Sequence, residues 1–298
     1  MPTAPLLSIV IPTRNRRDML FQAVQSVLQQ PLPFSFECIV SDNASDDSTP
    51  GVAAAFPEVK YIRRPELIPM WDHWNLCARE ARGKYVKMLC DDDWLIAGAL
   101  EREVLALNLD PTLTAAVSAR YEVCPPSDAV ISLKRFSSSR RRLGGARLQF
   151  AMLLGENILG PPSNLTFLRE CFLGYPEGYL YARDWAAWIQ LADQGNILFL
   201  PEPGCNFRVH PASLTSGHVA AGNDFLDVQA LRRECLRRLP ASARPVGWLI
   251  FAWIWCYRLL RRIARFVHRG ELRELAAFFG RIASYRPPVL PLGSAKEA

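Results

Sequence analysis

Apolar segments of strand length alternate with amphipathic segments of helix length along the first 125 residues. Short apolar runs bounded by turn residues or charges predict buried strands. These strands are expected at residues 6–12, 36–42, 58–64, 84–90 and 114–124. Apolar residues at helical spacing predict helices after Asn15 and over residues 70–83 and 98–109, with Asn15 as a helix cap and Gly83 as a helix stop. This alternation predicts an α/β fold, in which helices flank both faces of a mainly parallel sheet.

The second half of the chain is less regular. Residues 125–147 are rich in Pro, Ser and Arg, which predicts an exposed loop. A helix is expected over residues 182–195, and two further strands over residues 196–203 and 205–210. From about residue 220 onward the pattern is mainly helical.

Charge is distributed unevenly along the chain. The formal net charge is +6, and Lys and Arg gather in residues 134–147 and 232–273, whereas acidic residues gather in residues 37–49 and 91–93. Basic patches attract phosphates, acidic lipid head groups or nucleic acid. Because few aromatic residues are interleaved with the basic ones, no nucleic-acid partner is expected.

The cysteines and the N-terminus both indicate a reducing compartment. None of the eight cysteines belongs to a C-x-x-C pair, and several lie in apolar runs, so buried free thiols are expected. The N-terminal segment LLSIVIP lacks a basic leader and is interpreted as a strand rather than a signal peptide. These features predict a cytoplasmic protein.

One C-terminal segment suggests a membrane. Residues 245–257 (PVGWLIFAWIWCY) are apolar and rich in Trp, and the basic segment RLLRRIARFVHR follows. The apolar run is shorter than the roughly 20 residues that a membrane-spanning helix needs. Its tryptophans and arginines suit the interface between lipid and water, so residues 245–267 are expected to contact the membrane surface. A buried C-terminal helix or a dimer contact remains the alternative.

Polar motifs follow three of the predicted strands. Ligands collect beyond the carboxyl ends of parallel strands, which places PTRN, SDNASDD and CDDD along one edge of the sheet. The chain contains no G-x-G-x-x-G, P-loop or G-x-S-x-G motif. The carboxylates of Asp91, Asp92 and Asp93 are hard oxygen ligands that suit Mg²⁺ or Mn²⁺, and such an ion would neutralise a diphosphate. Taken alone, this acidic run is equally compatible with a solvated loop.

Together, the segments SIVIPTRNR, CIVSDNASDDST and ARGKYVKMLCDDDWL resemble the family 2 glycosyltransferases of the GT-A fold. Further on, RDWAAWIQLA and FRVHPASLT resemble the acceptor-side helix and the late metal-ligand strand of that family, so that the resemblance covers residues 6–215. It implies a catalytic domain over residues 1–220, with a donor half (1–120) and an acceptor half (121–220). Residues 221–298 would form a helical C-terminal extension.

The resemblance also implies roles for individual residues. The implied general base is Asp184, and the implied metal ligands are Asp92, Asp93 and His210. The implied donor-binding residues are Pro12, Thr13, Arg14, Asp42 and Asp91. From the residues alone, Asp42 could instead form an Asx turn, Asp184 could be a first-turn acid of a helix, and His210 a packed loop residue. The chain departs from the family pattern at Cys90, where the first Asp of the acidic motif is usual, and at Arg183, where Glu is usual.

The resemblance implies a metal-dependent inverting glycosyltransferase that uses Mn²⁺ or Mg²⁺ at the cytoplasmic face of the membrane. Its expected partners are a nucleotide-sugar donor and a glycan or lipid-linked glycan acceptor, as in the synthesis of cell-envelope polysaccharides or glycolipids. Two alternatives remain open at this stage. A nucleotidyltransferase would share strand-end aspartates, and a non-catalytic membrane-surface protein would retain the fold without the reaction.

Overall fold

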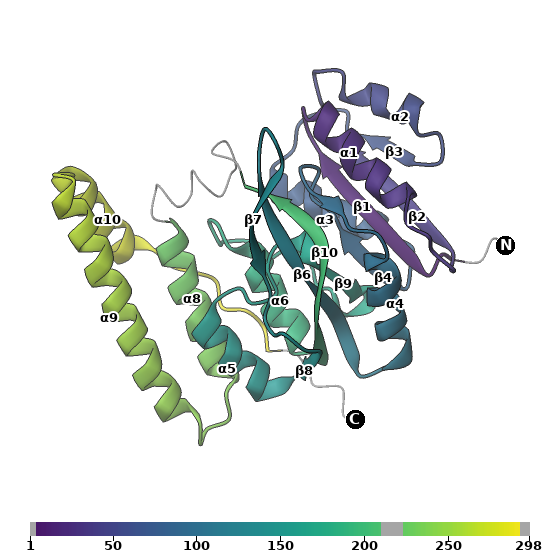
Figure 1. The fold of residues 1–298 in the computed structure, drawn as a ribbon. Coiled ribbons are helices and arrows are strands. Elements are labelled where there is room, and N and C mark those ends of the chain that lie inside the picture. The colour runs from purple at the N-terminus through teal and green to yellow at the C-terminus, as the bar shows by residue number, and fades with distance from the viewer. Residues whose placement is uncertain (1–3, 210–222, 293–298) are drawn as a thin grey trace.

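The computed structural model describes residues 4–209 and 223–292 of the chain. They form a ten-stranded sheet that is covered by helices on both faces (Figure 1). The strands are β1 (Leu7–Thr13), β2 (Phe36–Asp42), β3 (Lys60–Arg63), β4 (Tyr85–Met88), β5 (Trp94–Leu95), β6 (Leu113–Cys124), β7 (Ala129–Lys134), β8 (Arg141–Leu143), β9 (Leu165–Leu168) and β10 (Asn196–Arg208). The helices are α1 (Arg17–Leu28), α2 (Val52–Ala55), α3 (Met70–Glu80), α4 (Ala99–Leu109), α5 (Gly145–Gly155), α6 (Arg183–Ala192), α8 (Asn223–Arg238), α9 (Arg244–His268) and α10 (Leu272–Ser284), together with the short 3₁₀ turns η1 (Thr49–Gly51), η2 (Pro162–Asn164) and η3 (Arg169–Cys171).

The sheet is mainly parallel, as predicted. Its strand order is β3-β2-β1-β4-β9-β6-β10-β5, with β7 paired to β6 and β8 paired to β10. Strand β1 is parallel to β2 and β4, and β6 is parallel to β10. Because β9 is antiparallel to both β4 and β6, strands β6 and β10 run in the same direction as β1. The carboxyl ends of β1, β2, β4, β6 and β10 therefore lie along one edge of the sheet, which we call the rim.

Each face of the sheet has its own hydrophobic core. Side chains of successive residues in a strand point to opposite faces, so Ile9 of β1 joins one core and Val10 joins the other. Helices α1 and α4 cover the first core, to which Val24 and Leu100 contribute. Helices α3, α5, α6 and α8 cover the second core, in which Trp188 is fully buried. A strand that is buried on both faces explains the continuous apolar run of β1.

The C-terminal helices α9 and α10 form an outer layer against α8 (Figure 1). The inner face of α9 buries Gly247, Phe251 and Ile254. Its outer face is apolar and exposed, and Leu249 and Trp253 keep 73% and 69% of their surface open to solvent. Within residues 4–209 and 223–292, none of the helices combines the length and the apolar character that crossing a membrane requires.

The prediction of two strands over residues 196–210 was wrong. One long strand, β10, runs from Asn196 to Arg208 and pairs with β6 along its length. The pairing register shifts on both sides of Pro203. Proline lacks a backbone N–H and is tolerated at a bulge, so the strand bends at this position without ending.

The segment 125–147 is partly structured rather than a continuous loop. Strand β7 pairs antiparallel with β6, and β8 pairs antiparallel with β10. Most of its side chains are exposed, as predicted. The pairing depends on the edges of distant strands, which the local composition does not reveal.

Two predictions about helix ends were also wrong. Asn15 does not cap α1; it adopts a positive φ of 55° and exchanges hydrogen bonds with Asp46. Helix α3 ends at Glu80, before Gly83. Gly83 is required instead for close packing, since a Cβ atom there would lie 2.6 Å from the backbone nitrogen of Ser8.

The eight cysteines are free thiols. Five are buried, as predicted, and Cys90 is partly buried. The other two, Cys124 and Cys256, are exposed.

Candidate functional site

A cavity of about 1020 Å³ lies at the rim, which we call the main cavity. The loop after β1, the residue after β2, the loop after β4 and the end of β10 contribute to its wall. The first turn of α6 and the α5–η2 loop contribute a second group of lining residues, and the N-terminal part of α3 contributes aromatic ones. Of the predicted site residues, six line this cavity, namely Pro12, Thr13, Arg14, Asp91, Asp92 and Asp184.

Arg16 bridges two of the predicted aspartates. One guanidinium nitrogen lies 3.2 Å from Asp91 Oδ1 and 2.5 Å from Asp92 Oδ2. Thr13 Oγ1 donates a hydrogen bond to Asp91 Oδ2 at 2.8 Å. Burial raises the pKa of Asp91 to about 6, although Arg16 and Thr13 both favour its charged form. These adjacent carboxylates therefore need a positive charge beside them.

The third aspartate of the run points into the protein. Asp93 is 1% exposed and accepts hydrogen bonds from Ser163 Oγ at 2.6 Å and from the backbone N–H of Arg208 at 3.0 Å. Burial, followed by the charge of Asp92, raises the pKa of Asp93 above its usual range. Asp93 thus connects the acidic loop to η2 and β10, behind the wall of the main cavity.

The chemistry of this acidic loop fits a hard divalent cation. Ligand atoms of Cys90, Asp92 and Asp93 lie within 4.8 Å of one another. Burial raises the pKa of the Cys90 thiol well above its usual value, and sulfur is a soft ligand that hard cations disfavour. The two carboxylates are the ligand type that Mg²⁺ and Mn²⁺ prefer. The third predicted ligand, His210, lies outside the described residues.

Asp42 lies behind the cavity wall rather than on it. Its side chain is fully buried, and Oδ1 accepts hydrogen bonds from the Ser45 backbone N–H at 2.9 Å and from Ser45 Oγ at 2.5 Å. Its other oxygen accepts a 2.5 Å hydrogen bond from the Tyr61 hydroxyl. This bond to the Ser45 backbone spans three residues, one more than an Asx turn, so Asp42 makes a local side-chain-to-backbone hydrogen bond rather than the Asx turn that the sequence left open. The next residue, Asn43, lines the cavity and exchanges two hydrogen bonds with the backbone of Ile68, at 2.8 and 3.1 Å.

Asp184 lies in the first turn of α6. Its Oδ1 accepts a hydrogen bond from the backbone N–H of Trp185 at 2.7 Å, and its Oδ2 accepts one from Asn157 Nδ2 at 2.9 Å. Burial raises the pKa of Asp184 to about 6, against the opposing effect of these hydrogen bonds. A carboxylate with this pKa is ionised at neutral pH and still basic enough to accept a proton.

Arg208 connects several segments of the rim through hydrogen bonds, and the sequence analysis did not identify it as a site residue. Its guanidinium donates to both carboxylate oxygens of Asp128, at 3.2 and 3.0 Å, and to Gln22 Oε1 at 2.8 Å. It also donates to the backbone carbonyl of Asp92 at 2.9 Å and lies 4.7 Å from the centre of the Trp94 ring. The sequence signals were its place in the motif FRVHPASLT and in the predicted strand over residues 205–210. The bonding partners come from distant segments, which explains why the role was not visible.

Two further contributors were also missed. Arg16 is the last residue of the quoted motif SIVIPTRNR, but nothing in the sequence indicated that its side chain would reach the acidic loop. Asn157 lies in the loop between α5 and η2, and no local signal connects it to Asp184.

An aromatic platform borders the polar part of the main cavity. Trp71 and Trp74 of α3 line the cavity, with ring centres 5.9 Å apart, and Tyr175 lies behind them at 5.2 Å from Trp71. Tyr181 and Trp185 add to the lining near Asp184. Apolar walls with a few convergent polar groups are typical of ligand sites.

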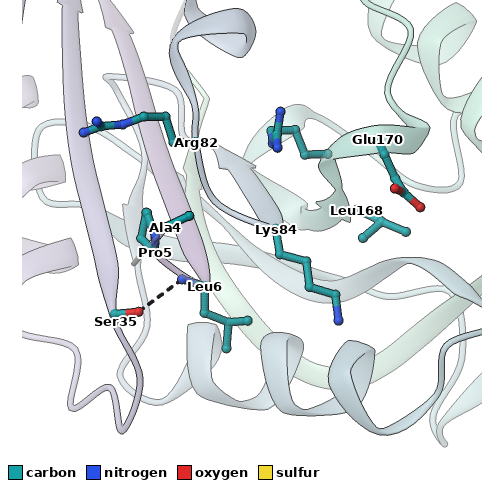
Figure 2. A pocket seen from close by; sticks show the side chains of 9 residues that line it. Ala4, Pro5, Leu6, Ser35, Arg82, Lys84, Leu168 and Glu170 are labelled. Atoms are coloured by element: carbon teal, nitrogen blue, oxygen red, sulfur yellow. Dashed lines mark hydrogen bonds between the residues drawn. The ribbon is translucent and has the colours of Figure 1, made fainter. Parts of the chain in front are cut away.

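A second, smaller cavity of about 360 Å³ lies at the opposite edge of the sheet (Figure 2). Leu6 and Lys84, which precede β1 and β4, line it together with Arg82 and Glu170. Figure 2 shows the charged ends of Arg82 and Lys84 pointing away from each other, so these two cations do not converge on one ligand. The paired carboxylates lie at the main cavity, which is therefore the candidate active site.

The fold of this chain is similar to those of solved structures. The chain resembles Staphylococcus aureus TarS 1–349 in complex with UDP-GlcNAc, with a TM-score of 0.70 and 15% identity over 94% of this chain and 80% of that one. It also resembles the mannosyltransferase PcManGT from Pyrobaculum calidifontis in complex with GDP-Man and Mn²⁺, with a TM-score of 0.57 and 18% identity over 95% of this chain and 81% of that one. At such identities the likeness shows a shared GT-A fold.

Sequence relatives indicate the same class. An uncharacterised glycosyltransferase of Rickettsia typhi is 24% identical over 79% of this chain and 73% of its own length. A GalNAc(5)-diNAcBac-PP-undecaprenol β-1,3-glucosyltransferase of Campylobacter jejuni is 34% identical over 101 residues, which is 32% of each chain. The model of the glycosyl transferase family 2 matches residues 8–170, which is more than half of the sequence. The chain therefore belongs to glycosyl transferase family 2, and the protein is a glycosyltransferase of the GT-A fold.

Proposed function

We propose that the protein transfers a sugar from a nucleoside-diphosphate donor to an acceptor hydroxyl, with inversion at the anomeric carbon and with Mn²⁺ or Mg²⁺ as cofactor. One observation carries this proposal, namely that a single cavity joins Asp91 and Asp92 on one wall to Asp184 on another. The complexes of the two structural neighbours with UDP-GlcNAc and with GDP-Man and Mn²⁺ support the donor class. Membership of the family favours glycosyl transfer over nucleotidyl transfer and over a non-catalytic role.

The donor half, residues 1–120, would hold the nucleotide. Pro12, Thr13, Arg14 and Asp91 would contact the donor directly, and Asp42 would shape the base-binding loop through its bonds to Ser45 and Tyr61. Asp92 and His210 would hold the metal ion, and Asp93, with a ligand oxygen within 4.8 Å of that of Asp92, would support the site from behind the cavity wall. When bound, the ion would neutralise the diphosphate and stabilise it as a leaving group. Arg16, which pairs with Asp91 and Asp92 and lines the same cavity, would offer the diphosphate a further positive charge.

The acceptor half, residues 121–220, would supply the base. Asp184 accepts the proton of the acceptor hydroxyl while that oxygen forms its bond to the anomeric carbon. The bond between the anomeric carbon and the diphosphate breaks in the same step, and its electron pair leaves with the diphosphate. A single displacement inverts the anomeric configuration. Trp71 and Trp74 offer apolar faces on which the acceptor would lie.

We predict that Asp92→Asn raises the Mn²⁺ concentration needed for half-maximal transfer by about 10- to 100-fold or more. This is the scale of effect seen even for residues that support metal ligands indirectly. Transfer of sugar from a panel of nucleotide-sugars is measured against Mn²⁺ concentration, after treatment with a chelator.

Asp18→Asn is the matched control, because the Asp18 side chain is 88% exposed and lies outside the main cavity. It should leave the metal dependence unchanged. Full transfer by the chelator-treated protein without added metal would contradict the metal dependence.

The acceptor is proposed to be a glycan or a lipid-linked glycan at the cytoplasmic face of the membrane, with residues 245–267 in contact with the lipid surface. Val246, Leu249, Trp253 and Leu260 form an exposed apolar stripe at helical spacing along α9. Exposed arginines of the same helix, among them Arg265, would meet anionic head groups. The glucosyltransferase relative, whose name includes an undecaprenol-linked glycan, supports the acceptor class.

We predict that Leu249→Glu and Trp253→Glu each weaken binding to anionic phospholipid vesicles by about 10-fold or more. Burial of such a side chain in the interface contributes about 1.5–3 kcal/mol, and about 1.4 kcal/mol corresponds to tenfold. Vesicle co-sedimentation measures the binding. Leu109→Glu on α4 is the control, because Leu109 is 83% exposed but lies far from α9 in the sequence and outside the stripe. A stable dimer in solution that both α9 substitutions dissociate would assign the stripe to a protein contact instead.

A further inference from the structure

Asn157 is fixed at both ends of its amide group. Its Nδ2 donates to Asp184 Oδ2 at 2.9 Å and also to the Gly160 carbonyl at 3.2 Å. Its Oδ1 accepts the backbone N–H of Gly160 at 3.2 Å. The Gly160 carbonyl also accepts a hydrogen bond from the indole N–H of Trp188, at 3.0 Å. The amide therefore presents one N–H to the carboxylate of Asp184 in a defined orientation.

The preceding residue, Glu156, has an unusual backbone conformation. It follows the last residue of α5 with a φ of 65° and a ψ of −137°, which is a conformation that favours glycine. Its backbone N–H donates to the Met152 carbonyl at 3.0 Å. A non-glycine residue keeps such a conformation only when its surroundings hold it there.

Two arginines of the C-terminal helices hold the side chain of Glu156. Arg232 of α8 lies 3.2 Å from Glu156 Oε1, and Arg258 of α9 forms an ion pair with the same oxygen. The Arg232 side chain is 2% exposed, and its Nε donates to the Leu153 carbonyl at 3.0 Å in the last turn of α5. Burial lowers the pKa of Arg232 to about 10. A buried guanidinium requires an anionic partner, which Glu156 supplies.

We propose that Asn157 is a positioning residue for the carboxylate of Asp184, and that Glu156, paired with Arg232 and Arg258, holds Asn157 in place. Helix α9 then acts on the reaction at a distance, since none of its residues is among those described as lining the main cavity. The inference rests on the proposed role of Asp184 as the base. It adds a physical connection between the C-terminal extension and the chemistry.

Several groups set the protonation of Asp184. Burial raises its pKa most, and the charge of Asp227 on α8 raises it further. The hydrogen bonds from Trp185 and Asn157 lower it. Tyr175, which also faces Asp184, has its own pKa raised by burial and stays neutral at neutral pH. Removal of the Asn157 donor should therefore raise the pKa of Asp184 and move the acidic limb of the pH–rate profile to higher pH.

The test compares Asn157→Leu, Glu156→Gln and Arg258→Gln with Arg269→Gln, an exposed arginine just beyond the end of α9. Asn157→Leu should lower kcat by about 10- to 100-fold, the value of a hydrogen bond to a charged group. Glu156→Gln and Arg258→Gln should lower kcat by a smaller factor of about 3 to 10. In all three the KM for the donor stays constant and the acidic limb moves to higher pH, whereas Arg269→Gln matches the wild type.

Two outcomes would overturn the inference. One is an unshifted pH profile in Asn157→Leu, and the other is a wild-type kcat in both Glu156→Gln and Arg258→Gln. Donor-induced thermal stabilisation is recorded for every variant, so that a loss of folding is separated from a loss of positioning. If Asp184→Asn itself retains full activity, Asp184 is not the base. That result is distinct from one in which only the proposed positioning of Asp184 by Asn157 and Glu156 fails.

Discussion

Replacement of Asp184 by Asn is expected to lower kcat for sugar transfer by about 10²- to 10⁴-fold, which is the typical contribution of a general base. The substitution keeps the size of the side chain and can still accept a hydrogen bond from Asn157, so the structure around α6 should persist. Donor binding should not change, because Asp184 lies on α6, whereas the proposed donor-binding residues lie on other walls of the cavity. The measurement is steady-state transfer at saturating donor, together with the KM for the donor.

The same mechanism predicts the pH dependence of the wild type. The base acts in its ionised form, and the pKa of Asp184 is about 6. Above that value kcat should approach a plateau, and below it kcat should fall about tenfold per pH unit. Glu177→Gln, at an exposed position in the loop before α6, is the control and should retain both kcat and the profile. Retention of more than a tenth of kcat in Asp184→Asn would exclude Asp184 as the base.

The second large effect concerns stability. Lys87→Met is expected to lower the free energy of unfolding by about 3–5 kcal/mol, because it leaves a buried carboxylate without its cation. Lys87 Nζ lies 2.7 Å from Glu103 Oε2, and both side chains are fully buried between β4 and α4. Ser118 and Thr166 donate to the same carboxylate, at 2.6 and 2.5 Å, but neither carries a charge.

Thermal and urea denaturation test this prediction. For a domain of about this size, each kcal/mol lowers the melting temperature by about 2–4 °C. Lys84→Met is the control, since Lys84 is exposed three residues earlier, and it should change stability by no more than about 0.5 kcal/mol. Lys87→Met combined with Glu103→Leu should recover part of the loss, because it removes both charges. An unchanged unfolding free energy for Lys87→Met alone would show that Glu103 does not depend on this cation.

The order of elements and the position of the rim could be predicted from the sequence. Strand β2 was placed at residues 36–42, where the structure has it, and the strands β1, β4 and β6 were placed within two residues at each end. These predictions succeeded because periodicity and turn residues are local properties. The gathering of Thr13, Asp91 and Asp92 followed from one further rule, that parallel strands bring their carboxyl ends to the same edge.

Pairings between distant segments could not be predicted. Strand β9 inserts antiparallel between β4 and β6, and the segment before it carries Asn157 to Asp184. The segment 125–147 becomes partly ordered because the edges of β6 and β10 are available to it. Each of these results depends on which strand edges remain unpaired after the rest of the sheet has formed.

The sequence by itself determined the α/β class, the family motifs and the residues available for chemistry, because spacing and residue type are properties of the chain. Only the tertiary structure decided the direction in which each side chain points. It turned Asp42 and Asp93 into the protein, placed Arg16 against Asp91 and Asp92, and joined Glu156 to helix α9. The physical reason is that a buried charged group needs a hydrogen-bonding or oppositely charged partner nearby. Which groups are buried, and which lie near them, depends on the packing of the whole chain.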